Sequence, residues 1–167
     1  MTPERAPPTE QAASTPPDLA ALHARVFSDL PPPWPATAFA EFLALPGTLL
    51  ASRPGGFALA LALGPEAELL TLAVLPAFRR RGLGGALLAE IISRAAASGA
   101  SEMFLEVAET NAPARALYLG AGFAERGRRR GYYGRRGFPA IDALVMARPL
   151  SATTAAVPEA AAGRKTI

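Results

Sequence analysis

Three arginines and three glycines within seven residues form the segment of this 167-residue chain whose residue types most plainly suggest chemistry. The segment reads Arg79-Arg80-Arg81-Gly82-Leu83-Gly84-Gly85 and stands between an apolar run and a long amphipathic stretch. Glycines at a helix start let a ligand approach the backbone. The free N–H groups and the positive end of the helix dipole favour phosphate oxygens. The residues therefore predict a turn that binds pyrophosphate.

Two common phosphate-binding motifs do not fit this turn. It has no Gly-Lys-Ser/Thr, and Leu87 stands where the pattern G-x-G-x-x-G would place its third glycine. A glycine-tolerant turn with surface arginines fits the same residues. Residue types alone leave both interpretations open.

The turn must be positioned by helices and strands, which differ in the spacing of their hydrophobic residues. Leu83, Leu87, Ile91 and Ala95 recur every four residues and predict a helix over about 82–98. A strand–helix–strand unit over 67–108 implies one parallel strand pair. We predict an α/β (α+β) fold whose mixed, mostly antiparallel central sheet carries helices on both faces. The expected strands are 48–53, 57–63, 67–74, 102–108, 123–132 and 138–148, and the other helices begin at the caps Asp18, Thr37 and Asn111.

Length and composition indicate one domain over residues 18–150, between disordered tails at 1–17 and 151–167. Half of the residues are hydrophobic, yet the longest apolar run, 57–63, is far shorter than the ~20 residues of a membrane span. There is no cysteine, the net charge is +3, and the N-terminus lacks a basic-then-apolar signal segment. We expect a cytoplasmic protein without a membrane partner.

The turn and the segments after it resemble the GCN5-related N-acetyltransferase superfamily. The matching residues are Arg-x-x-Gly-x-Gly after the strand at 69–74, then Leu105-Glu106-Val107, Asn111, Ala116-Leu117-Tyr118 and Gly122-Phe123. Over residues 18–150 the chain resembles more closely the bacterial ribosomal-protein alanine N-acetyltransferase subfamily, through Trp34, Tyr132-Tyr133 and the strand 142–146. Gly131, where the subfamily usually has asparagine, and the prolines of 31–35 depart from its pattern.

The resemblance implies the acyl-CoA N-acyltransferase fold, acetyl-CoA as co-substrate and no metal. It places the pantetheine arm along 72–74, where the N–H of Val74 would polarise the thioester carbonyl, and near Asn111. It places the pyrophosphate on 80–85. The full set of cofactor residues that it implies is Leu72, Ala73, Val74, Arg79, Arg80, Arg81, Gly82, Leu83, Gly84, Gly85 and Asn111.

Glu106 and Tyr118 are the candidate catalytic pair. The resemblance implies that Glu106 takes the proton of the attacking amine and that Tyr118 donates to the departing thiolate, with no acyl-enzyme. Spacing alone also fits a strand-end glutamate that reaches solvent and a core tyrosine. The single histidine, His23, has no evident partner for a metal site.

The acceptor is expected to be a protein N-terminus, and the subfamily implies the N-terminal alanine of a ribosomal protein. An α-amine has a pKa near 8 and lysine near 10.4, so deprotonating lysine at neutral pH costs roughly 3 kcal/mol more. Trp34, Tyr132 and Tyr133 are interpreted either as walls of an acceptor groove or as a capped loop and a hairpin pair.

Two other functions stay open. The first is acetyl transfer to lysine or to a small amine. The second is a basic module that docks weakly on RNA or the ribosome through Arg126–Arg136, where arginines alternate with tyrosines.

Overall fold

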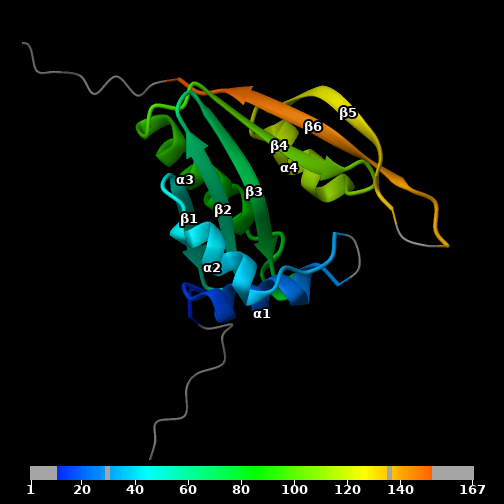
Figure 1. Cartoon of the computed structure of the whole chain (residues 1–167), viewed down its shortest axis with the longest axis horizontal. Helices are drawn as coiled ribbons and strands as arrows, with labels where there is room; N and C mark the ends of the chain where they lie inside the picture. The colour runs from blue at the N-terminus through cyan, green and yellow to red at the C-terminus, as the bar shows by residue number, and fades with distance from the viewer. Residues whose placement is uncertain (1–10, 29–30, 135–136, 152–167) are drawn as a thin grey trace, which may run out of the picture.

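The computed structural model of this chain describes residues 11–28, 31–134 and 137–151 (Figure 1). Its elements, in chain order, are α1 Pro16–Val26, α2 Ala36–Ala44, β1 Thr48–Arg53, β2 Gly56–Leu63, β3 Glu66–Val74, a short 3₁₀ turn Pro76–Phe78, α3 Leu83–Ala97, β4 Glu102–Ala108, α4 Ala112–Gly120, β5 Ala124–Tyr133 and β6 Ile141–Pro149. Residues 1–10 and 152–167 of the two expected tails lie outside this description.

The six strands form one sheet in the order β1-β2-β3-β4-β6-β5. Only β3 and β4 are parallel, and every other neighbouring pair is antiparallel. The predicted fold class, with its single parallel pair, is confirmed. The strand–helix–strand unit produces that pair because a strand returning after α3 must run in the direction of the first.

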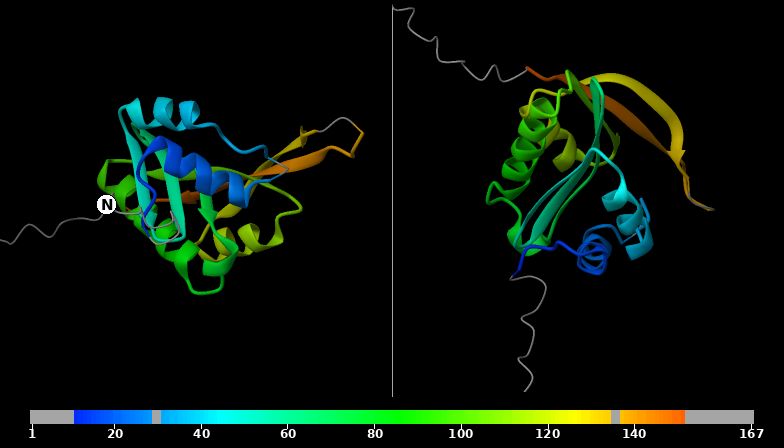
Figure 2. Two further views of the ribbon diagram at one scale, coloured as in Figure 1. Left: turned by 90° about the horizontal axis from the view of Figure 1, so that it is seen from below. Right: turned by 60° about the vertical axis from the view of Figure 1, so that its left-hand side comes forward.

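Helices cover the two faces of the sheet unequally (Figure 2). On one face, α3 and α4 pack over a core that contains Leu87, Ile91, Met103 and Leu105. On the other, α1 and α2 cover the half made by β1–β3, with Leu19 and Phe39 among the buried side chains. The β4–β6–β5 half of this second face carries no helix in the figure, and the β5–β6 hairpin extends away from the domain.

Two helix starts differ from the sequence expectation. The N-cap of α1 is Thr15, whose hydroxyl accepts from the N–H of Asp18 at 3.4 Å, so Asp18 lies in the first turn and is not the cap. α2 begins after Pro35 with no side-chain cap, so Thr37 also lies inside its helix. Residues 11–17, assigned by sequence to the tail, contact the domain: Ala12 bridges to Pro54 and Ala13 is buried.

One irregularity in β3 changes the geometry of the sheet. Leu69 and Thr71 pair with the consecutive residues Ala60 and Leu59, so Leu70 is an extra residue, a β-bulge. The pairing of β3 with β4 runs from Glu66–Glu102 to Leu69–Leu105 and stops there. Beyond that point the two strands diverge (Figure 1). The end of β3 therefore has β2 on one side and no strand partner on the other.

Candidate functional site

The glycine-rich turn leads from the end of β3 into α3. Gly82 is the N-cap of α3, in the left-handed conformation with φ 77°, and no side chain caps the helix. Because the first N–H groups of a helix have no intrahelical acceptor, those of Leu83, Gly84 and Gly85 can bind an external acceptor. The predicted turn thus has the backbone geometry of an anion site.

The three glycines of the turn have different structural roles. A Cβ on Gly84 would lie 3.4 Å from Leu117 and 3.7 Å from Val74, so this glycine lets α3 approach α4 and β3 closely. A Cβ on Gly85 or on Gly82 would meet nothing within 4 Å, and only Gly82 has a positive φ. Gly82 is therefore needed for the turn, and Gly84 is needed for close packing. At position 85 the fold itself does not require glycine, because a side chain would meet no neighbour.

The three arginines also differ. The Arg79 Nε donates to the carbonyl of Val74 at 3.1 Å, which ties this side chain to the end of β3. Arg80 and Arg81 are exposed and form no hydrogen bond or ion pair with another described residue. Two cations therefore remain free beside the helix start.

The unpaired edge of β3 exposes backbone donors. The Leu75 N–H donates to the carbonyl of Gly55 at 2.8 Å, on the β2 side. Because successive residues of a strand direct their N–H groups to opposite edges, Leu72 and Val74 direct theirs toward the side where β4 has left. Ala73 directs its N–H to β2, and its side chain is buried under α1 and α2.

Glu106 lies on β4, one residue past the last β3–β4 pair, and its side chain is 24% exposed. Its Oε1 accepts from the Arg129 guanidinium of β5 at 2.6 Å. The same guanidinium lies 4.3 Å from the ring centroid of Tyr132. Sequence reasoning grouped Arg129 with an anion-binding cluster and missed this contact.

Tyr118 of α4 is 7% exposed and packs edge-on against Phe123. Burial, and to a smaller extent Tyr133, raises its pKa to about 12. Burial and then Glu106 raise the pKa of Tyr133, which packs edge-on against Tyr132 with ring centroids 5.1 Å apart. Tyr133 therefore affects the pKa of Tyr118, and Glu106 affects the pKa of Tyr133.

The departures noted in the sequence have local explanations. Gly131 has φ 59°, a left-handed conformation that glycine and asparagine adopt most readily, so glycine fits the backbone at the position where the resemblance led us to expect asparagine. Its N–H donates to Asp142 Oδ1 at 2.8 Å. Asn111 is the N-cap of α4, with Oδ1 accepting from the N–H of Ala114, and only its amide N–H₂ remains for a ligand.

The aromatic residues near α1 form a packed cluster. The Trp34 ring stacks on Phe42 and His23, and the backbone N–H of Trp34 donates to His23 Nδ1 at 3.2 Å. The His23 Nε2 lies 3.2 Å from the hydroxyl of Thr71. The sequence named no partner for His23, and the structure gives it two hydrogen-bond partners, neither of which is a histidine or a carboxylate. The contacts of Trp34 are those of the capped loop, one of the two interpretations that the sequence left open. Among the described residues there is no group of three potential metal ligands.

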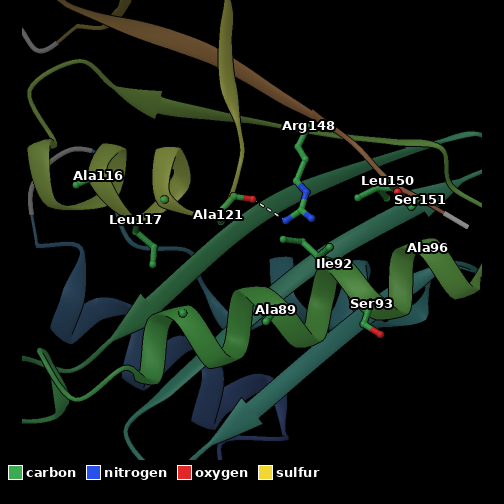
Figure 3. A pocket seen from close by; sticks show the side chains of 12 residues that line it. Ala89, Ile92, Ser93, Ala96, Ala116, Leu117, Ala121, Arg148, Leu150 and Ser151 are labelled. Atoms are coloured by element: carbon green, nitrogen blue, oxygen red, sulfur yellow. Dashed lines mark hydrogen bonds between the residues drawn. The ribbon is translucent and has the colours of Figure 1, made fainter. Parts of the chain in front are cut away.

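A groove of about 730 Å³ runs between α3, α4 and the end of β6 (Figure 3). Figure 3 shows Ala89, Ile92 and Ser93 of α3 on one side and Leu117 of α4 on the other. The groove begins at Gly85, next to the free helix start, and ends near Arg148, which donates to the carbonyl of Ala121 at 2.6 Å. The small residues of α3 that line this groove could have indicated it in the sequence, but the sequence analysis considered only the apolar face of the helix.

Comparison with known proteins identifies the fold and the family. Residues 19–123 match the model of the acetyltransferase (GNAT) family. A [ribosomal protein bS18]-alanine N-acetyltransferase of Escherichia coli is 41% identical over 103 residues, 59% of this chain and 66% of that relative. The one from Haemophilus ducreyi is 37% identical over 91 residues, 54% of this chain and 63% of that relative. The aligned segment thus spans slightly less than two thirds of each relative.

Solved structures agree. The crystal structure of the E. coli ribosomal-protein-alanine N-acetyltransferase superposes with a TM-score of 0.69 at 33% identity, covering 79% of this chain and 85% of that one. Chaetomium thermophilum Naa20, at 21% identity and a TM-score of 0.70 over 83% of this chain and 85% of that one, shares the fold. With the family model matched over more than half of its length, this chain belongs to the acetyltransferase (GNAT) family.

Proposed function

We propose that this protein transfers the acetyl group of acetyl-CoA to the N-terminal α-amine of a protein, with the N-terminal alanine of a ribosomal protein as the first candidate acceptor. Acetyltransferases of this family use acetyl-CoA. Relatives 37–41% identical are alanine N-acetyltransferases of a ribosomal protein. The observation that carries the proposal is the divergence of β3 and β4 after Leu69–Leu105, with Glu106 and the free N–H of Val74 on the strand segments beyond it.

The residues of the turn fit a cofactor that carries a pyrophosphate. The helix start at Gly82 has free N–H groups and no capping side chain, and Arg80 and Arg81 lie free beside it. We assign the pyrophosphate to Arg80–Gly85 and the pantetheine arm to 72–74 and the amide of Asn111. Arg79 has a structural role, because its Nε donates to the Val74 carbonyl at the end of β3. Bound there, acetyl-CoA supplies an activated thioester.

Each proposed catalytic group has one task. The Val74 N–H donates to the carbonyl oxygen as negative charge develops on it. The new N–C bond forms while the C–S bond breaks, and Glu106 accepts the proton that the amine loses. Tyr118, whose pKa is about 12, keeps its proton at neutral pH. A thiol has a pKa near 8.5, so Tyr118 stabilises the departing thiolate by donating a hydrogen bond rather than by full transfer of its proton.

Mass spectrometry of peptides incubated with acetyl-CoA tests the proposal directly. We expect one acetyl group on the α-amine of peptides that begin with alanine, and a rate that depends on the first three residues. Glu106→Gln should lose most turnover and still bind acetyl-CoA. Equal rates on all peptides, or a preference for free polyamines or lysine side chains, would replace the α-amine with another acceptor. Unchanged turnover of Glu106→Gln would remove Glu106 from the mechanism.

Docking on RNA through Arg126–Arg136 has weaker support. Three β5 arginines contact carboxylates: Arg126 contacts Glu102 at 3.6 Å, Arg128 contacts Glu109 at 2.7 Å, and Arg129 contacts Glu106. Paired arginines attract phosphate less than free ones. Arg135 and Arg136 lie outside the described residues. Salt-sensitive RNA binding by a protein without acetyltransferase activity would favour this second function.

A further inference from the structure

His23 of α1 is a buried polar side chain that joins three parts of the fold. It is 1% exposed and lies among aromatic rings, of which those of Phe27 and Trp34 have centroids 4.3 and 5.4 Å away. Its Nδ1 accepts from the backbone N–H of Trp34, and its Nε2 lies 3.2 Å from the Thr71 hydroxyl of β3. One ring therefore links α1 to β3 and to the connection between α1 and α2.

The two contacts define where the ring carries its proton. Burial lowers the pKa of His23 to about 4, so the imidazole is neutral at neutral pH. A neutral imidazole has one donor and one acceptor nitrogen, and Nδ1 is the acceptor because it faces the N–H of Trp34. The Nε2–H is then the donor to the oxygen of Thr71. The link between α1 and β3 thus has a fixed direction and needs both side chains.

Thr71 lies on the part of β3 that has lost one of its neighbours. It follows the bulge and comes two residues after Leu69, the last residue of β3 that pairs with β4. From Thr71 to Val74 the strand pairs with β2 alone, so ladder hydrogen bonds hold only one of its edges. The bond from His23 restrains this segment from the face that α1 covers, three residues before Val74.

Stability alone does not require this polar pair. A neutral hydrogen bond contributes only about 1 kcal/mol, and replacement of both partners by apolar groups of the same shape is close to neutral. A hydrogen bond does add direction, because it is strong only over a narrow range of distance and angle. His23 and Thr71 therefore fix where β3 lies against α1 more than how stably it lies there.

We infer that His23 is a positioning residue for acetyl transfer: through Thr71 it fixes the unpaired segment of β3, so that the N–H of Val74 meets the thioester carbonyl at hydrogen-bond distance. The inference rests on the proposed function, in which Val74 supplies that donor. A displacement of about 1 Å can lower the rate of an enzyme about a hundredfold, so a small movement of this segment has a measurable effect.

Two pairs of variants test the link. Thr71→Val removes the hydroxyl, whereas Thr71→Ser keeps it. His23→Asn places an amide near Nδ1 and leaves Thr71 without its donor, whereas His23→Gln places an amide N–H₂ near Nε2. We expect kcat on an alanine peptide to fall about tenfold in Thr71→Val and His23→Asn, less than the 10²–10³-fold effect of losing a carbonyl donor completely. Thr71→Ser and His23→Gln should restore most of kcat, and KM for the peptide and Kd for acetyl-CoA should not change in any of the four.

The matched control is a strand hydroxyl elsewhere. Thr48 of β1 donates from its hydroxyl to the Phe42 carbonyl of α2, so Thr48→Val removes a comparable link between a helix and a strand and should leave kcat unchanged. Fluorescence of Trp34, the single tryptophan of the chain, shows in each variant whether the rings around position 23 stay packed. If Thr71→Val does not fold, His23→Asn provides the same test.

A second measurement reports on the carbonyl donor without any acceptor. Acetyl-CoA with an isotopically labelled acetyl carbonyl is bound to each protein, and its NMR resonance is compared with that of free acetyl-CoA. A hydrogen bond to the carbonyl oxygen moves this resonance downfield. We expect the displacement to be largest in wild type, smaller in Thr71→Val and His23→Asn, and close to wild type in Thr71→Ser and His23→Gln.

The outcomes separate the two proposals. A wild-type protein that does not acetylate the alanine peptide overturns the proposed acceptor, and the carbonyl resonance then decides the role of His23 by itself. A wild-type resonance equal to that of free acetyl-CoA overturns the role of Val74 and that of His23 with it. A displaced resonance that Thr71→Val and His23→Asn leave unchanged overturns the positioning role alone. An equal loss of kcat in all four variants also overturns it, because two of them keep the bond between positions 23 and 71.

Discussion

Gly85 offers a sharp test of the proposed cofactor turn, because its function and its structural cost act in opposite directions. It is the third residue of α3, and a Cβ there would meet nothing within 4 Å. Glycine within a helix costs roughly 0.5–1 kcal/mol relative to alanine. Gly85→Ala should therefore raise the free energy of unfolding by about 0.5 kcal/mol or more, and raise Tm by roughly 1–4 °C.

The same substitution should weaken acetyl-CoA binding. Gly85 lines the groove and carries one of the free N–H groups of the helix start. A methyl group there would push a phosphate away from the backbone, and one hydrogen bond to a charged group contributes about 1.5–3 kcal/mol. We expect Kd for acetyl-CoA to rise about tenfold or more, measured by titration calorimetry alongside thermal unfolding of the ligand-free protein.

A second glycine of the turn provides the contrast. Gly82 also has open space around it, but its φ is 77°. Gly82→Ala should destabilise the free protein by about 1–2 kcal/mol, because a side chain strains the left-handed conformation. A Gly85→Ala protein that gains stability and binds acetyl-CoA as well as wild type would refute a close approach of the cofactor to Gly85. A loss of stability in that variant would refute the open geometry.

Three more predictions concern the surroundings of the site. Burial lowers the pKa of His23 to about 4. The free energy of unfolding is therefore highest above pH 6.5 and decreases by roughly 3 kcal/mol as pH falls through 4, and His23→Gln should flatten this part of the pH profile of stability. Burial raises the pKa of Tyr118 to about 12, so its contribution is present below pH 10 and is lost as pH rises through 12; Tyr118→Phe should lose turnover and abolish this alkaline loss of stability. Asp142→Ala removes the acceptor of the Gly131 N–H and a partner of Arg128, and steady-state kinetics should show a higher KM for the peptide with an unchanged KM for acetyl-CoA.

Local patterns in the sequence were sufficient for most of the fold. The period-four pattern predicted α3 to within one residue at each end, and the expected strands 48–53 and 57–63 agree with β1 and β2 to within one residue. The cap of α1 was misassigned although its signal was present, since Thr15 directly precedes Pro16 and proline favours the first helical position. Strand β6 begins at Ile141 rather than at 138, because residues 137–140 belong to the connection that follows β5.

The site was only partly predictable. The glycine turn is local in sequence, so its residues could be named, although the separate tasks of Gly84 and Gly85 depend on what each Cβ would meet. The contact of Arg129 with Glu106 spans 23 residues and depends on the register of β5. That register shifts between Glu125 and Gly127 and again between Arg129 and Tyr133. Alternation along β5 cannot give the face of Arg129 when two irregularities intervene.

The bulge at Leu70 links these features. Before it, Ala67 and Leu69 face α3; after it, Ala73 faces α1 and α2 while Leu72 and Val74 face α3. A bulge bends its strand and increases the local twist. It coincides here with the loss of pairing to β4. The N–H of Val74, the proposed carbonyl donor, lies on the segment that follows the bulge, where β3 pairs with β2 alone.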